Sequence, residues 1–284
     1  MGASSSCGCS PMEVEAELSF HPAADGTFSS KYSLLSRVAD GEFAEVWVGK
    51  AKRTDEDIAV KLTKQKHAMA RAFVELREAI LDQKFTLIVM ELLKGGELFD
   101  HILQRGQLTE DDCRSVTRDI VGALAYLHSR GVVHRDVKPD NCLFTEPPDP
   151  SQPLPRLKLC DFGLARFMPT NDLQGPMLTV CGTPGYAAPE LVGGNGSYGG
   201  QCDMWAAGVL LYEALSGRCP FDTRQLGKDF RNLHWSFAPK DFRRVSLDAM
   251  DLIKRLIVTQ PKKRLSAEQV VVNLVGSGGS MTDA

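Results

Sequence analysis

Three short stretches of this chain gather side chains that can bind cations and move protons. The first reads His-Arg-Asp-Val-Lys-Pro-Asp-Asn over residues 134–141, the second Asp-Phe-Gly over 161–163 and the third Ala-Pro-Glu over 188–190. Carboxylate and amide oxygens bind hard divalent cations, a carboxylate can also accept a proton, and lysine neutralises negative charge. The three motifs together, in this order, are far more specific than any one of them alone.

In this order the motifs resemble those of the eukaryotic serine/threonine protein kinases. The resemblance extends from about Tyr32 to Leu274, and Gly-Gly-Glu-Leu-Phe-Asp over 95–100 is similar to the calcium/calmodulin-dependent and calcium-dependent kinase group. It implies ATP and Mg²⁺ as cofactors, with transfer of the γ-phosphate to serine or threonine hydroxyls of protein substrates. Phosphoryl transfer requires mainly positioning and charge neutralisation, and each motif would supply one part.

The resemblance gives roles to four residues of these motifs. Asp136 would accept the proton of the substrate hydroxyl, and Lys138 would hold the γ-phosphate. Asn141 would bind one Mg²⁺ from the same loop, while Asp161 would chelate the Mg²⁺ that bridges the phosphates. The lysine at position 138 resembles serine/threonine rather than tyrosine kinases, which indicates the substrate class.

Upstream, Ile-Ala-Val-Lys over 58–61 resembles the strand whose lysine grips the α- and β-phosphates. Read alone, Lys61 would be the solvated end of a strand, but its place ahead of the other motifs favours the catalytic interpretation. In the family a helical glutamate pairs with this lysine. We expect Glu78 to be that partner, with Glu75 one turn away as the alternative.

The segment from Val38 to Val46 resembles the loop that covers the phosphates, and both of its ends belong to the expected nucleotide site. The family's loop carries three glycines, whereas this one keeps only Gly41 and has Ala39 and Ala44 in the other two places. A methyl group there limits φ > 0 conformations and close backbone approach, so a lower nucleotide affinity is expected. An ordinary hairpin turn is the alternative interpretation.

Met-Glu-Leu-Leu over 90–93 resembles the hinge between the two kinase lobes. By that resemblance, backbone groups of Glu91 and Leu93 would meet the adenine base. Ala59 and Leu143 would enclose its ring from either side. Plain core packing is the alternative for these apolar positions, and it is compatible with the nucleotide-binding role.

Glu97 lies within the 95–100 stretch that resembles the calmodulin-dependent group. In that group the glutamate often contacts a basic residue that precedes the target serine or threonine. The resemblance therefore implies protein substrates with basic residues before the phosphorylated position. A solvated surface carboxylate is the alternative.

A switch is expected in the loop that follows the Asp-Phe-Gly motif. Thr179 stands four residues before Thr183, where many relatives are phosphorylated for activation. Arg135, which has no other evident partner in the sequence, would clamp that phosphate through bidentate hydrogen bonds and so order the loop. A threonine in an exposed loop is the alternative.

The resemblance gives structural roles to three further residues. Glu190 and Arg264 resemble the two halves of a family ion pair. Asp203 resembles a group that braces the catalytic loop. These residues would shape the site without touching the substrate.

Two differently built halves must hold these groups. Runs rich in β-branched and aromatic residues predict strands at 34–38, 45–49, 58–62 and 85–90, and apolar residues recur at helical spacing between 72 and 80. Later apolar faces predict helices over 113–127, 203–216 and from 246 onward. The predicted fold is α+β and bilobal, protein kinase-like, with a small β-rich lobe carrying one helix and a larger, mainly helical lobe.

The small lobe is unusually short after its predicted helix. Only thirteen positions separate Glu78 from Glu91, whereas kinases usually place about thirty there, including a whole strand. We therefore expect an edge strand of the small-lobe sheet to be missing. An exposed inner edge would invite association or instability.

The predicted domain division follows from these patterns. Residues 1–30 are expected to be a disordered arm, residues 31–275 a kinase domain with lobes 31–93 and 94–275, and residues 276–284 a disordered tail.

The chain begins Met-Gly-Ala-Ser-Ser-Ser, which fits the pattern for myristoylation of Gly2. Cys7 and Cys9 follow as candidate palmitoylation sites. Because one myristoyl chain binds a membrane only marginally, a second acyl group would provide stable anchoring. A location at the cytoplasmic face of a membrane is expected, and a plain Ser/Gly-rich tail is the alternative.

Composition excludes several other classes of protein. A formal net charge of −3 and a pI near 6.1 give no reason to expect nucleic acid as a partner. The eight cysteines show no zinc-type pairing, so reduced thiols are expected. The chain carries no calcium-binding loop pattern and no apolar run of about 20 residues.

Two functions therefore compete at this point. A serine/threonine kinase is favoured by the retention of Lys61, Asp136, Asn141 and Asp161. A pseudokinase-like module, which keeps the fold and binds nucleotide but catalyses poorly, is favoured by the two alanines of the phosphate loop and by the short small lobe.

Overall fold

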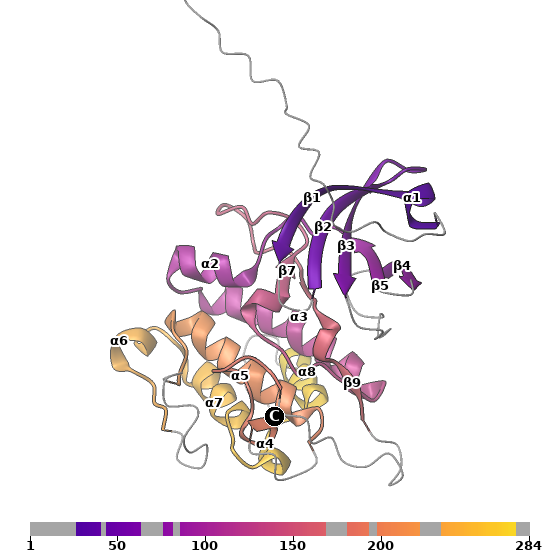
Figure 1. Cartoon of the computed structure of the whole chain (residues 1–284). Helices are drawn as coiled ribbons and strands as arrows, with labels where there is room; N and C mark the ends of the chain where they lie inside the picture. The colour runs from indigo at the N-terminus through magenta and orange to yellow at the C-terminus, as the bar shows by residue number, and fades with distance from the viewer. Residues whose placement is uncertain are drawn as a thin grey trace, which may run out of the picture.

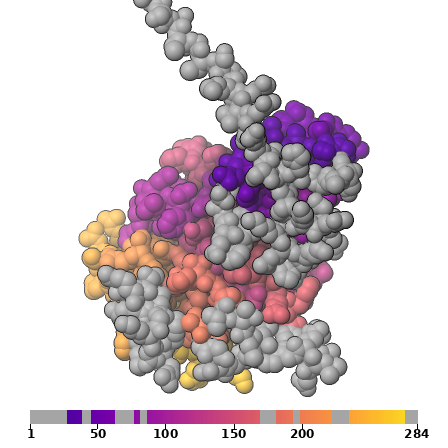
Figure 2. All heavy atoms as spheres, viewed as in Figure 1, coloured from indigo at the N-terminus to yellow at the C-terminus, as the bar shows by residue number. Residues whose placement is uncertain are grey.

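The molecule has two separate apolar cores. The computed structural model describes residues 27–40, 44–63, 76–81, 86–168, 181–192, 198–221 and 234–276. One core forms among the N-terminal strands and the other among the C-terminal helices. Figure 1 shows the sheet above the helical body, and Figure 2 shows the filled surfaces of the two parts meeting, indigo above and magenta to yellow below. The α+β architecture with two lobes is confirmed.

The small lobe is built on a five-stranded antiparallel sheet in the order β1-β2-β3-β5-β4. All four predicted strands are present; the first three are longer than predicted, and the fourth is shifted by one residue. The elements of this lobe are α1 (Thr27–Lys31), β1 (Tyr32–Asp40), β2 (Ala44–Ala51), β3 (Glu56–Thr63), β4 (Leu76–Leu81) and β5 (Thr86–Glu91).

Alternation along β3 explains how the small lobe presents its lysine. Successive side chains of a strand point to opposite faces. Ile58, Val60 and Leu62 are buried in the small-lobe core, so Ala59 and Lys61 lie on the other face. The core thus holds the strand that carries Lys61 in place.

The strand predicted to be missing is present. The segment predicted as the end of a helix forms β4, which pairs with β5 from Leu76↔Met90 to Leu81↔Thr86. Its residues favour helix locally, but β5 has an unpaired side whose buried backbone groups require hydrogen bonds, and this tertiary demand outweighs a weak propensity. Both the predicted helix over 76–80 and the predicted loss of the edge strand were wrong. The twelve residues 64–75, including Glu75, lie outside the described residues.

Glu78 brings the two edge strands of the sheet together. β1 and β4 are at opposite ends of the strand order, yet Lys31 Nζ and Tyr32 Oη, where α1 meets β1, donate to Glu78 at 2.7 and 2.9 Å. These hydrogen bonds, that from Lys31 above all, lower the pKa of Glu78. The sheet is therefore curled, and its two edges are joined by one carboxylate.

Phe28 closes the end of this curled sheet. It is 1% exposed and belongs to the small-lobe core, and its ring lies 5.4 Å from that of Tyr32. The first described element, α1, begins at Thr27, a few residues before position 31, where the sequence predicted the start of the domain.

The large lobe is mainly helical, and its long helix α3 packs against α5 and α8. The helices predicted after Thr109, over 203–216 and after Ser246 are all present. The elements are α2 (Leu98–Arg105), α3 (Glu110–Ser129), β6 (Val132–Val133), β7 (Cys142–Phe144), β8 (Leu157–Leu159), β9 (Arg166–Phe167), α4 (Pro189–Val192), α5 (Gln201–Ser216), α6 (Pro239–Phe242), α7 (Leu247–Leu256) and α8 (Ala267–Gly276).

Local signals account for the ends of these helices. Thr109 Oγ1 accepts a hydrogen bond from the backbone N–H of Asp112, and Ser246 Oγ accepts one from that of Ala249, as side-chain caps do. Gly217 ends α5 with φ of 73°, a conformation that favours glycine. None of the helices in the described ranges is both long and apolar enough to span a membrane.

Candidate active site

One buried carboxylate anchors the catalytic loop from behind. Asp203, near the start of α5, is 1% exposed. Its two oxygens accept hydrogen bonds from the backbone N–H groups of His134 at 2.9 Å and Arg135 at 2.7 Å, and His128 Nε2 lies 2.9 Å away. These contacts hold the loop backbone against the large-lobe core. They are the bracing role that the sequence predicted for Asp203.

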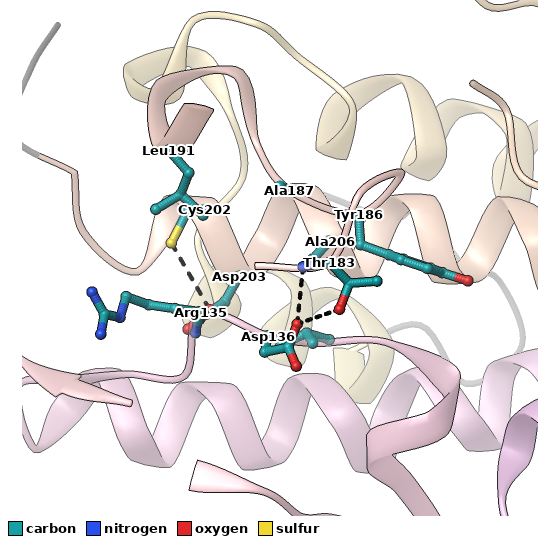
Figure 3. Close-up of a pocket in the computed structure, with 10 residues that line it drawn as sticks. Arg135, Asp136, Thr183, Tyr186, Ala187, Leu191, Cys202, Asp203 and Ala206 are labelled. Carbon is teal, nitrogen blue, oxygen red and sulfur yellow. Dashed lines mark hydrogen bonds between the residues drawn. The ribbon is translucent and has the colours of Figure 1, made fainter. Parts of the chain in front are cut away.

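Asp136 is held from two sides. Asn141 Nδ2 donates to its Oδ2 at 3.0 Å and to its carbonyl oxygen at 2.8 Å. On the other side Thr183 donates to Oδ1 through its backbone N–H at 3.1 Å and through its hydroxyl at 2.7 Å, which Figure 3 shows as dashed lines. Three of these hydrogen bonds reach the carboxylate and fix its orientation, and the fourth holds the backbone carbonyl of the same residue.

Lys138 completes this group. Its Nζ donates to Thr183 Oγ1 at 2.9 Å and lies 3.3 Å from Asp136 Oδ2. The cavity drawn in Figure 3 lies behind these residues and has a volume of about 10 Å³, close to that of one water. It is a packing void that is too small for a substrate.

Lys61 meets Asp161 across the two lobes. Its Nζ donates to Asp161 Oδ1 in a short ion pair, although the residues are 100 positions apart. The predicted pairing of Lys61 with Glu78 is wrong, because Glu78 lies on β4 and bonds Lys31 and Tyr32 instead. The expected convergence of the small-lobe lysine and the Asp-Phe-Gly aspartate is present.

Asp161 adopts a backbone conformation that only a constrained site maintains. Its φ is 57°, in the left-handed region, and its Oδ1 accepts the N–H of Gly163 at 3.0 Å. Burial by itself raises the pKa of Asp161, but the nearby Lys61 and the hydrogen bonds outweigh it and hold this pKa below the usual value. The group is therefore a carboxylate at neutral pH, as a metal ligand must be.

His134 and Phe162 support this aspartate from below. Their rings meet edge to face with centroids 4.6 Å apart. Complete burial lowers the pKa of His134, so the imidazole is neutral, and its Nε2 lies 3.0 Å from the carbonyl oxygen of Cys160. This edge-to-face pair joins the catalytic loop to the segment that carries Asp161.

Asn141 and Asp161 suit a magnesium ion that is also held by phosphates. The Nδ2 of Asn141 is bonded to Asp136, so its Oδ1 is left to serve as a ligand. Across the described ranges no three His, Cys, Asp or Glu side chains are grouped to hold a metal. Mg²⁺ accepts such sparse protein ligation, because it is usually bound through one or two protein oxygens, substrate phosphates and water.

The expected nucleotide-binding positions lie around the face of β3 that carries Lys61. Ala59 is buried and pairs with Met90, while Val38 at the end of the phosphate loop is 64% exposed. Val46 pairs with Lys61 itself. Gly41 lies outside the described residues. The side chains of Ala39 and Ala44 are also outside what the structure describes.

The hinge carries a contact that the motifs did not indicate. Lys158 Nζ, on β8, donates to Glu91 Oε1 at 2.5 Å. This ion pair ties the side chain of Glu91 in the hinge to the large lobe. Leu93 follows Glu91 in the chain, and Leu143 lies on β7. Both side chains are half-buried.

Arg135 has hydrogen-bond partners in the structure. It was expected to clamp a phosphate on Thr179 because the sequence showed no other partner for it. Its Nε donates to the carbonyl oxygen of Leu164 at 2.5 Å and its Nη1 to the hydroxyl of Tyr198 at 2.7 Å. Thr179 lies outside the described residues. No sequence motif pointed to Tyr198, which stands between the Ala-Pro-Glu motif and α5.

Glu97 lies among other acids. Burial, then the neighbouring Asp140 and Asp100, raise its pKa, and Lys138 acts in the opposite direction. A carboxylate with two like charges nearby is stabilised by an added cation. The family ion pair between Glu190 and Arg264 is also formed, at 2.6 and 3.2 Å.

Comparison with known proteins matches this geometry. The protein kinase domain family matches residues 66–274, which include the whole catalytic loop and Asp161. The chain belongs to the protein kinase family. The matched range begins after Lys61, which lies on β3, and includes Asp136, Asn141 and Asp161 in the large lobe.

The relatives belong to one branch of the kinases. Calcium/calmodulin-dependent protein kinase type IV of Mus musculus is 43% identical over 202 residues, covering 70% of this chain and 41% of the relative. Type 1B of Rattus norvegicus is 33% identical, with 90% and 78% covered, and CBL-interacting protein kinase 9 of Oryza sativa is 31% identical, with 88% and 57% covered. This kinase thus spans less than half the length of the type IV relatives that it matches.

Proposed function

We propose that this protein transfers the γ-phosphate of ATP to serine and threonine hydroxyls of protein substrates. The observation that supports this most strongly is the convergence of Lys61 and Asp161 on one side and of Asp136, Asn141 and Lys138 on the other. These residues come from both lobes and from segments far apart in the sequence. Their charges are those that phosphoryl transfer requires.

The contacts suggest how each residue acts. The Oδ2 of Asp136 accepts the proton of the attacking hydroxyl, while Thr183 and Asn141 keep the carboxylate oriented. Lys138, 3.3 Å from that oxygen, neutralises the charge of the transferred phosphoryl group. Lys61 holds the α- and β-phosphates, and Asn141 and Asp161 provide the magnesium ligands. When bound, Mg²⁺ supplies charge neutralisation at the phosphates.

A weakly catalytic, pseudokinase-like nucleotide-binding module is the second candidate. It is favoured by Ala39 and Ala44 in the phosphate loop and by the twelve residues that connect β3 to β4. The argument from a missing strand no longer supports it, because β4 completes the sheet. The preserved geometry around Asp136 favours the enzyme.

Mg-ATP should both stabilise the protein and serve as its phosphate donor. A ligand that binds only the folded state stabilises it by mass action, by about 2.7 kcal/mol at one hundred times Kd. We expect the melting temperature to rise with Mg-ATP and a serine peptide with preceding basic residues to become phosphorylated. Lys61→Met should remove most of the thermal shift.

The two measurements separate the two candidates. A thermal shift without peptide phosphorylation would favour the pseudokinase-like module. The absence of both at millimolar Mg-ATP would contradict an intact nucleotide site. Equal shifts for the wild type and Lys61→Met would contradict the role given to Lys61.

The preferred substrates are proposed to carry basic residues before the target serine or threonine. The acids around Glu97 support this, since a substrate cation would relieve their mutual repulsion. A library of serine peptides that differ only in the number and place of arginines tests it. Equal rates for all of them would contradict the proposal.

Phosphorylation of Thr179 is proposed as the activating switch, with Arg135 as its clamp. The phosphate would have to share the guanidinium with Leu164 and Tyr198, which already accept two of its hydrogen bonds. Mass spectrometry of the active protein tests this directly. Full activity of Thr179→Ala would contradict it.

Membrane attachment is proposed through acylation of Gly2 together with Cys7 or Cys9. Because a single myristoyl chain binds marginally, with an association constant of about 10⁴ M⁻¹, both signals are required. We expect Gly2→Ala to release the protein from membranes in cell fractionation, and Cys7→Ser with Cys9→Ser to release most of it. Unchanged fractionation of Gly2→Ala would contradict the anchor.

A further inference from the structure

Arg135 is held in a conformation that its surroundings must enforce. Its φ is +70°, in the left-handed region that favours glycine. Such a residue persists only where several contacts fix it. Its side chain is 9% exposed and points away from Asp136, into the large lobe, as Figure 3 shows. The position of Asp136, the next residue, therefore depends on what holds Arg135.

The Arg135 guanidinium donates hydrogen bonds to two partners. The carbonyl oxygen of Leu164 accepts from Nε at 2.5 Å, just after the Asp-Phe-Gly motif. The hydroxyl of Tyr198 accepts from Nη1 at 2.7 Å. Tyr198 is 6% exposed, so water cannot readily replace this hydroxyl.

The Tyr198 hydroxyl also reaches the other side of the site. It donates a hydrogen bond to the side chain of Cys181, and a hydroxyl can accept and donate at the same time. Cys181 stands two residues before Thr183, which gives Asp136 two of its four hydrogen bonds. One oxygen atom thus joins the catalytic loop to the loop that grips the proton acceptor.

We propose that Tyr198 is a positioning residue for phosphoryl transfer, whose hydroxyl links Arg135 to Cys181 and thereby aligns Asp136 between Asn141 and Thr183. The proposal rests on the proposed kinase function. Within the described part of the chain, the hydroxyl of Tyr198 contacts Arg135 and Cys181, and it would act through these two neighbours. Its effect should therefore appear in the rate of transfer and not in the binding of ATP.

Tyr198→Phe tests the proposal because it keeps the buried ring and removes one oxygen. The change leaves the buried Nη1 of Arg135 without its partner and frees Cys181. We expect kcat for peptide phosphorylation by the full chain to fall by about tenfold, which corresponds to about 1.4 kcal/mol in the barrier. The KM for ATP should stay within about twofold, since differential effects on kcat identify interactions used in the transition state.

Tyr212→Phe is the matched control. Tyr212 is also a buried tyrosine of the large lobe, 4% exposed, and its hydroxyl donates to the carbonyl oxygen of Ser236 at 2.8 Å. Tyr212→Phe loses one buried hydrogen bond and Tyr198→Phe loses two, so the melting temperature should fall in both variants. Of these two variants, only Tyr198→Phe should show a lower kcat. Cys181→Ala, which removes a single arm of the link, should give an intermediate kcat and supports the same conclusion if Tyr198→Phe fails to fold.

The outcomes are distinct. Full kcat in Tyr198→Phe, or an equal loss of kcat in Tyr198→Phe and Tyr212→Phe, would overturn the positioning role and leave the kinase function intact. Full kcat in Cys181→Ala would overturn the link through the 181–183 segment. A wild-type chain that binds Mg-ATP but transfers no phosphate would overturn the proposed function itself, and the positioning role with it.

Discussion

Replacing Asp136 by asparagine should abolish phosphate transfer while leaving a folded protein. One carboxylate oxygen of Asp136 accepts a hydrogen bond from Nδ2 of Asn141, and the other accepts one from the hydroxyl of Thr183. An asparagine at this position cannot accept at both ends, so its amide would face another N–H donor, and it can no longer take a proton. General base catalysis contributes about 10²–10⁴-fold. We expect a loss of at least about 10²-fold in peptide phosphorylation.

Asp111→Asn is the control for this change. Asp111 is a carboxylate on the first turn of α3 with an 86% exposed side chain, so the variant loses the same charge far from the site. It should keep wild-type activity. Mg-ATP should still raise the melting temperature of Asp136→Asn. Equal phosphate incorporation by Asp136→Asn and wild type would mean that another residue accepts the proton.

Replacing Phe28 by alanine should strongly destabilise the small lobe. The side chain is 1% exposed in the small-lobe core, and loss of a buried phenylalanine typically costs about 3–5 kcal/mol because a cavity remains. The change should also loosen α1, whose end places Lys31 and Tyr32 against Glu78. We expect a lower denaturation midpoint by circular dichroism or calorimetry, and weaker stabilisation by Mg-ATP.

Phe167→Ala provides the comparison. Phe167 lies on β9 and is 61% exposed, so its truncation should cost little. A Phe28→Ala protein as stable as Phe167→Ala would mean that α1 does not pack on the sheet in solution. In that case residues 27–30 would belong to the arm, as the sequence predicted.

The residues of the catalytic loop could be predicted because they are neighbours in the chain. Asp136, Lys138 and Asn141 lie within six positions, and a short turn brings such residues together whatever surrounds them. The large-lobe helices were equally accessible, since Thr109, Ser246 and Gly217 mark helix ends by local hydrogen bonding and backbone conformation. Family order then indicated that Lys61 and Asp161 would meet.

The position and the partners of Glu78 could not be predicted from the sequence. Its neighbours have helical spacing, and helical spacing is a property of the segment alone. The sheet, however, had an open side at β5, and closing it with β4 satisfied buried backbone groups that no local pattern reveals. Glu78 was thereby carried away from Lys61 and placed against Lys31 and Tyr32.

The sequence by itself determined the family and the two-lobed α+β plan and predicted the reacting groups, because these depend on contiguous motifs and on periodicity. Only the tertiary structure decided the partners of Lys61, Glu78 and Arg135. Each of these charged side chains can reach several partners, and the one that it meets depends on which distant segments pack beside it. Tyr198 belongs to this second class, since a buried hydroxyl acquires a role only from the two loops that fold around it.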